Sequence, residues 1–205
     1  MVGALDVRHI TIQTIVYRSE RASTVRYSCV AILVSVLPVQ KLNKLADDWN
    51  VSPGTLSALG IGWDPQINAY TFPEIDGSSH IILIVKRDSE TGKKLAYYRS
   101  KRGLSYAQNW ELTEDQPILI PEGGSDTAAL HSLGLNAVGR PSATGGVDHL
   151  AELLADCSHD QEIIVLGEND EKDDGECPGR DGAIRVASKL QKIVEATVKV
   201  GAATD

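Results

Sequence analysis

Cysteine is scarce in this sequence of 205 residues, and its spacing excludes two common uses. Cys29, Cys157 and Cys177 are odd in number and form no Cys-x-x-Cys pair, so neither a disulfide framework nor a zinc ribbon is expected. Acidic residues outnumber basic ones by 28 to 20, which gives a net charge of −8. This excludes a basic field over the whole protein, so any contact with polyanions requires a local patch or metal ions. We expect a protein of the reducing cytoplasm.

Long apolar runs are also missing. The most apolar stretch, residues 29–39, has 11 residues, whereas a membrane-spanning helix needs roughly 20. It lies too deep in the chain, and lacks the small-residue cleavage site, for a secretion signal. Its β-branched residues predict a buried strand instead. We therefore expect no membrane partner.

The rest of the sequence divides into three parts. Residues 1–40 are strand-like but carry no motif, and they stay unassigned. Residues 41–110 predict a small α+β unit, in which Ser52 caps and Pro53 begins a short helix before a hairpin. In the third part, residues 111–205, strands and helices alternate. This order predicts an α/β fold with a parallel sheet and helices on both faces, with strands at 117–121, 135–138, 162–166 and 198–200 and helices at 125–133, 147–155 and 181–196.

Acidic residues follow two of these predicted strands. Glu122 directly follows the first, and Glu168 and Asp170 follow the third. If the two strands are neighbours, the three carboxylates converge at one edge of the sheet, where a divalent cation would relieve their repulsion. Oxygen ligands without nearby Cys or His favour Mg²⁺ or Mn²⁺. The alternative is that these acids are helix caps and solvated turn residues.

Three segments of this part resemble the Toprim domain of bacterial-type primases, type IA and II topoisomerases and some nucleases. They are ILIPEGGSD (residues 118–126), LGLNAVG (133–139) and IVLGEND (164–170). The Toprim signature is a strand ending in Glu-Gly-x-x-Asp and a later strand ending in Asp-x-Asp. The preceding part, with NVSPGTLSALGIGWD, AYTFPEIDG and YYRSKRGL, resembles the segment before Toprim in phage- and plasmid-type primase/helicase proteins.

The resemblance implies a role for each acid. Glu168 and Asp170 would hold Mg²⁺ or Mn²⁺ against nucleotide phosphates. Glu122 would be the catalytic general acid or base, or a further ligand. Asp126 would cap and orient the loop, and Gly123 would let the backbone approach a phosphate, although a plain tight turn explains the glycine equally well.

The sequence also departs from the Toprim pattern. Glu168 replaces the first Asp of Asp-x-Asp and is one methylene longer, and an acidic insertion at 171–180 separates the acid pair from the last helix. The sequence ends at Asp205, where many Toprim proteins continue, and it has no zinc ribbon and no GxxxxGK[ST] loop. We therefore expect slow activity that depends on a separate helicase or DNA-loading partner.

A basic segment contrasts with the acidic remainder of the chain. Residues 86–102 contain seven basic and two acidic residues, with Tyr97, Tyr98 and Tyr106 in or near them. This pattern is typical of a single-stranded nucleic-acid track that combines backbone contacts with base stacking, although a solvated hairpin face gives the same pattern. The predicted contact residues are Lys86, Arg87, Lys93, Lys94, Arg99, Lys101 and Arg102.

Three functions follow from these observations. The first is primase-like nucleotidyl transfer on single-stranded DNA with Mg²⁺, in DNA replication of a mobile element. The second is a Toprim nuclease. The third is an inactive, DNA-binding relic of such a primase.

Overall fold

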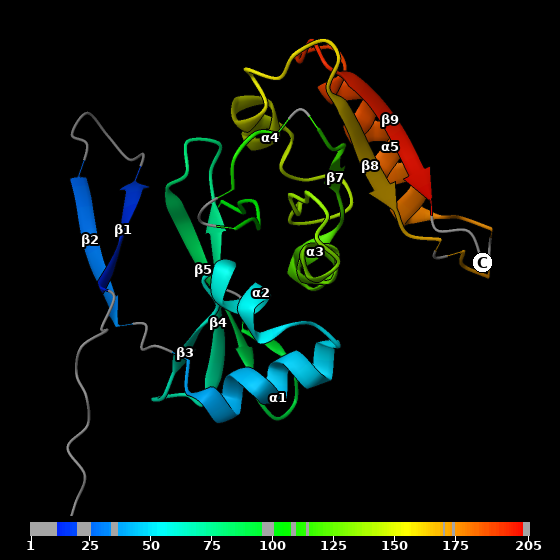
Figure 1. Cartoon of the computed structure of the whole chain (residues 1–205). Coiled ribbons are helices and arrows are strands. Elements are labelled where there is room, and N and C mark those ends of the chain that lie inside the picture. Colours follow the sequence, from blue (N-terminus) through cyan, green and yellow to red (C-terminus); the bar gives the residue numbers. More distant parts are fainter. Residues whose placement is uncertain are drawn as a thin grey trace, which may run out of the picture.

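The computed structural model describes residues 12–19, 26–33, 37–95, 101–107, 110–113, 115–169, 171–173 and 175–202. Within these residues the strands form a two-stranded, a four-stranded and a three-stranded sheet (Figure 1). No helix in the described ranges combines the length and the apolar character needed to cross a membrane.

The first sheet is an antiparallel hairpin of β1 (Ile12–Ser19) and β2 (Arg26–Leu33). Residues 29–33 of the strand predicted at 29–39 belong to β2, and residues 34–36 lie outside the described ranges. Pro38 lies in an extended conformation, and helix α1 begins directly after it at Val39. A proline fixes φ and lacks an N–H, so it suits the position just before a helix.

Two helices then precede the second sheet. α1 (Val39–Trp49) buries Leu45 and Ala46. Ser52 caps α2 (Pro53–Ala58) by accepting a hydrogen bond from the Thr55 N–H at 3.1 Å. The prediction of this cap is confirmed.

The second sheet is antiparallel and has the strand order β3-β4-β5-β6. Its strands are β3 (Gly62–Asp64), β4 (Ala69–Ile75), β5 (Ile81–Asp88) and β6 (Lys94–Leu95). Leu56 of α2 packs with Trp63 and Tyr70 of this sheet in one apolar core. The expected hairpin between β5 and β6 is present, while residues 96–100 lie outside the described ranges.

The third sheet is parallel, with the order β7-β8-β9, and is flanked by helices. Its α/β order and its neighbouring strands agree with the prediction. α5 packs on β8 and β9 (Figure 1). The elements of this part are β7 (Ile118–Ile120), α3 (Gly123–Ser132), α4 (Val147–Leu153), β8 (Glu162–Gly167), α5 (Pro178–Leu190) and β9 (Thr197–Ala202).

Several predicted boundaries differ from the structure. α3 begins at Gly123, whose φ of 84° turns the chain from the strand directly into the helix. Residues 135–138 contain one isolated parallel bridge, between Ala137 and Leu119, instead of a strand. α5 ends at Leu190, because the Gln191 side chain bonds to Ala196 O and Val198 N and so stabilises a turn into β9.

Each apolar core contains residues from both sides of position 110. Ile75 and Leu104 belong to the core that includes β7, β8 and α5. Ala128 of α3 belongs to the core that includes α1 and α2. α3 accordingly lies between the antiparallel and the parallel sheet (Figure 1). The division into units at residues 110 and 111 remains a prediction.

Candidate active site

The carboxyl ends of β7 and β8 lie side by side. The two strands are parallel, with Ile120 opposite Val165. Glu122 follows Ile120 by two residues, and Glu168 follows Val165 by three. Both acids therefore lie at the same edge of the sheet. This is the edge where ligands bind in open α/β sheets.

Glu122 occupies the junction between β7 and α3. It pairs with Arg140 in a parallel bridge, in which the Gly123 N–H donates to Arg140 O at 2.8 Å. The Arg140 N–H donates in turn to Pro121 O at 2.9 Å. The backbone on both sides of Glu122 is thereby fixed, while its side chain keeps 27% of its surface exposed. Such a carboxylate is both positioned and accessible.

Arg140 is the residue that the sequence analysis missed. Its side chain has 0% exposure, and its guanidinium lies 3.7 Å from Glu122 Oε2. It also donates to Leu166 O at 3.1 Å and to Ala143 O at 3.4 Å. Burial lowers the pKa of Arg140, while Glu122, Glu168 and Asp126 act in the opposite direction. The three acids therefore interact electrostatically with a buried positive charge of the protein, the guanidinium of Arg140.

Asp126 and Glu168 complete the described part of the acidic group. Burial raises the pKa of Asp126, Glu168 raises it further, and Arg140 partly opposes them. Asp126 lies in the first turn of α3, but no side chain caps this helix. Asp126 therefore lies inside the helix, as expected, but makes no capping hydrogen bond, and its role in orienting the loop remains a prediction.

The predicted metal site is described only in part. Asp170 lies outside the described residues. In the part of the chain that the structure does describe, no three His, Cys, Asp or Glu side chains are arranged to hold a metal ion. Glu168 is exposed and carries the oxygen donors that Mg²⁺ prefers. The donor chemistry fits a hard cation, and its binding remains a prediction.

Three of the predicted nucleic-acid contacts are engaged within the protein. Lys86 Nζ lies 2.6 Å from Asp64 Oδ2, and only 11% of its side chain is exposed. Arg87 lies over the rings of Trp49 and Phe72. Arg102 donates to both carboxylate oxygens of Glu74, a nearly buried residue. The structure therefore removes Lys86 from the predicted track.

The remaining basic residues differ in their accessibility. Lys93, Lys94 and Lys101 are exposed. Arg99, Tyr97 and Tyr98 lie outside the described residues. Tyr106 is 3% exposed and donates through its hydroxyl to Asp76 O at 2.8 Å, so it cannot stack on a base as predicted.

An open cavity of about 570 Å³ adjoins the end of the basic segment. Lys101 and Arg102 line one part of it, and residues around the beginning of α4 line another. Lys189 of α5 adds a third positive charge to the cavity wall. Asp148 and Glu152 also line the cavity.

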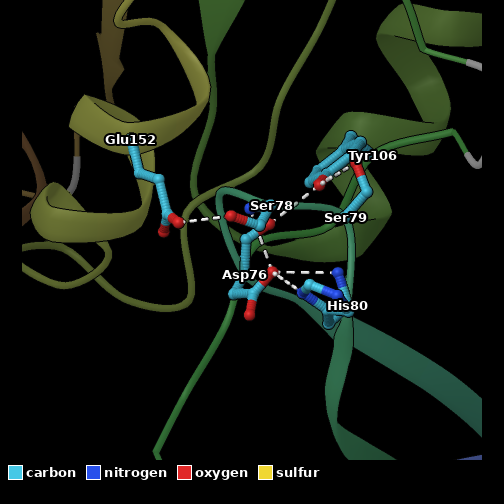
Figure 2. A network of polar contacts seen from close by, with 6 residues as sticks. All are labelled: Asp76, Ser78, Ser79, His80, Tyr106 and Glu152. Carbon is cyan, nitrogen blue, oxygen red and sulfur yellow. Dashed lines mark hydrogen bonds and ion pairs between the residues drawn. The ribbon is translucent and has the colours of Figure 1, made fainter.

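A polar network holds the β4–β5 turn against α4 (Figure 2). The Ser78 hydroxyl donates to the Glu152 carboxylate, and Asp76 accepts from the N–H groups of Ser78 and His80. A side chain at Gly77 would overlap Glu152 and the backbone of His149, so the turn lies directly on the helix. The network fixes Glu152 at the wall of the cavity.

Solved structures share this fold at low sequence identity. The chain matches a structure of the primase DnaG catalytic domain bound to single-stranded DNA with a TM-score of 0.58 and 17% identity, over 82% of this chain and 67% of that one. The Escherichia coli primase catalytic core gives 0.58 and 17%, over 81% and 66%. No protein-family model and no curated protein sequence matches the chain.

A phage structure gives a similar result. A chain in the complex of bacteriophage T7 lagging-strand DNA polymerase with primase domains of two gp4 subunits, bound to an RNA/DNA hybrid and dTTP, matches with a TM-score of 0.52 and 18% identity, over 84% of this chain and 80% of that one. The chain spans about two thirds of the DnaG cores. It has a primase-type Toprim fold, so the resemblance inferred from the sequence is confirmed for the fold.

Proposed function

We propose that this protein is a primase-like nucleotidyltransferase that acts on single-stranded DNA with Mg²⁺ or Mn²⁺. One observation carries the proposal: Glu122 and Glu168 share one strand-end edge of a primase-type fold, where the backbone of Glu122 is fixed on both sides. Similarity to primase cores supports this assignment.

Each acid has a part in the proposed reaction. Glu168 and Asp170 would hold the metal ion, which when bound would neutralise charge on nucleotide phosphates. Glu122 would accept the proton of the attacking 3′-hydroxyl, because its carboxylate is exposed beside the same edge. Gly123 would let the phosphates approach the start of α3.

Single-stranded DNA would follow the exposed cations toward this edge. Lys93, Lys94 and Lys101 are available on the surface, and Lys101 and Lys189 line the same cavity. We further propose that a separate helicase or DNA-loading protein in the cytoplasm delivers the strand, as part of the replication of a mobile element.

The direct test is incubation of the protein with single-stranded DNA, labelled ribonucleotides and Mg²⁺ or Mn²⁺. A product that forms only with template and nucleotides supports the proposal. Strand cleavage without nucleotides would indicate the nuclease instead. Neither activity at high Mn²⁺ and high enzyme, with DNA binding retained, would identify a relic.

Substitution of Asp170 by Asn should weaken the binding of Mn²⁺. A carboxylate binds a hard cation more strongly than an amide does, and Mg²⁺-type sites depend on one or two such groups. The measurement is paramagnetic broadening of backbone NMR signals around Glu168 during a Mn²⁺ titration. Asp173→Asn, in the same acidic segment, is the matched control. Equal broadening in the wild type and Asp170→Asn would remove Asp170 from the site.

Replacement of Lys93, Lys94 and Lys101 by Ala should weaken binding of single-stranded DNA. The slope of log K against log salt should decrease by about 0.7 for each lost phosphate contact. The control replaces Lys44, Lys192 and Lys199, which are also exposed and change the net charge equally. If both triple variants have the same slope, the track lies elsewhere.

A further inference from the structure

We propose that Arg140 is a built-in counterion of the acidic site, which positions Glu122 and keeps the affinity for free divalent cations low. This inference rests on the proposed function, since it assumes that the same acids bind a metal ion. It concerns a residue that has no counterpart in the Toprim signature motifs quoted above. Arg140 would act through the carboxylates, as a positioning residue.

The contacts of Arg140 connect the two strand ends. Its guanidinium lies 3.7 Å from the carboxylate after β7 and donates to Leu166 O at 3.1 Å, within β8 and two residues before Glu168. The backbone of Arg140 forms hydrogen bonds with Pro121 and Gly123, the two neighbours of Glu122 in the chain. One residue thus fixes the main chain next to the first acid and spans to the strand that carries the second.

The charge of Arg140 changes the balance at this edge. Glu122, Asp126 and Glu168 bear a formal charge of −3 when ionised, and the guanidinium reduces it to −2. All three carboxylates act electrostatically on Arg140. The sequence alone predicts that a divalent cation relieves the repulsion between the acids. Part of this relief comes from the protein, so free cations gain less on binding.

Within the described part of the chain, the guanidinium of Arg140 does not use all of its hydrogen-bond donors, as a buried arginine with a purely structural role would be expected to do. Its Nη1 is buried, and it has no hydrogen-bond partner among the described residues. An unsatisfied buried donor is unfavourable, and a buried charge is kept only where other charges compensate for it. Here the compensation comes from the carboxylates of the site. This arrangement favours a role of Arg140 as the counterion of those acids.

The experiment compares Mn²⁺ binding to the wild type, Arg140→Gln and Arg140→Lys by electron paramagnetic resonance, without DNA or nucleotides. Removal of a nearby unit charge should raise the Mn²⁺ affinity about tenfold or more in Arg140→Gln. Arg140→Lys keeps the charge and should remain within about threefold of the wild type. Arg185→Gln, an exposed arginine on α5, is the control and should change nothing.

Two outcomes would overturn the proposal: equal or weaker Mn²⁺ binding by folded Arg140→Gln, or no binding by any variant. If Arg140→Gln does not fold, the wild type still provides a test through the NMR signal of the Arg140 Nε–H. Mn²⁺ should broaden this signal before that of Arg185, and an unaffected signal at saturating Mn²⁺ would contradict the proposal. Primer synthesis is measured in a separate assay. A failure of the proposed function is therefore distinguishable from a failure of the proposal about Arg140, which is tested by Mn²⁺ binding alone.

Discussion

Glu122→Gln should reduce nucleotide-dependent product formation by about 100-fold or more, which is the usual scale for loss of a general base. The amide has nearly the same shape but cannot accept the proton of the attacking hydroxyl. Arg140 is fully buried and would lose the charge of Glu122, 3.7 Å away, while Asp126 and Glu168 still act on it, so the free energy of unfolding should fall by about 1–3 kcal/mol. Single-turnover incorporation of labelled ribonucleotide, with urea unfolding in parallel, measures both effects.

The control for this variant is Glu111→Gln, an identical change at an exposed residue that precedes β7. It should leave incorporation and DNA affinity unchanged. Binding of single-stranded DNA by Glu122→Gln should also match the wild type, since the predicted track does not include Glu122. Incorporation by Glu122→Gln at the wild-type rate would refute the assignment of Glu122.

Gly139→Ala should destabilise the protein and impair the same activity. A Cβ at Gly139 would overlap Thr127 Oγ1 and lie 2.9 Å from Gly123 O. Thr127 is fully buried and donates to Gly123 O at 2.7 Å, so it has little room to move. We expect a loss of about 1–3 kcal/mol in the free energy of unfolding, as for other overpacked sites. The shift of α3 would also displace Glu122.

Gly54→Ala is the matched control, because the nearest atom to its Cβ would be Ser52 Oγ at 3.8 Å. Gly54 lies in α2, where alanine is the better helix former. Urea titration should therefore show a small change or a gain in stability. Equal stability of Gly139→Ala and the wild type would show that the approach of residue 139 to α3 is looser than described.

The convergence of Glu122 and Glu168 could be predicted because it follows from local patterns. The short apolar runs ILI and EIIVLG, each followed by acids, indicate buried parallel strands, and the carboxyl ends of such strands share an edge. The pairing of β7 with β8 confirms this reasoning. Short apolar runs that end in acidic residues are thus enough to place Glu122 and Glu168 at one edge of the sheet.

The role of Arg140 could not be predicted in the same way. A single arginine after a short apolar segment has no periodic signal, and its contact with Leu166 joins residues 26 positions apart. The same limit applies to the basic segment. Lys86 pairs with Asp64 and Arg102 with Glu74, at separations of 22 and 28 residues. A count of charges cannot tell which cations have partners inside the fold.

The predicted start of α3 was wrong for a local reason. Ser125 is a favourable capping residue, which predicted a helix start there, but the positive φ of Gly123 begins the helix two residues earlier. Conformational freedom at a glycine allows such a turn without fixing it. The shift matters for function, because it makes Glu122, and not Gly124, the residue directly before α3.

The central claim is that the strand ends of β7 and β8 form a metal-dependent reaction centre. Anomalous diffraction from crystals grown with Mn²⁺ and a nucleoside triphosphate tests it most directly. The account predicts a manganese peak within coordination distance of Glu168, with the triphosphate on the same ion and Glu122 beside it. Bound triphosphate with its manganese at another place on the protein would contradict the account.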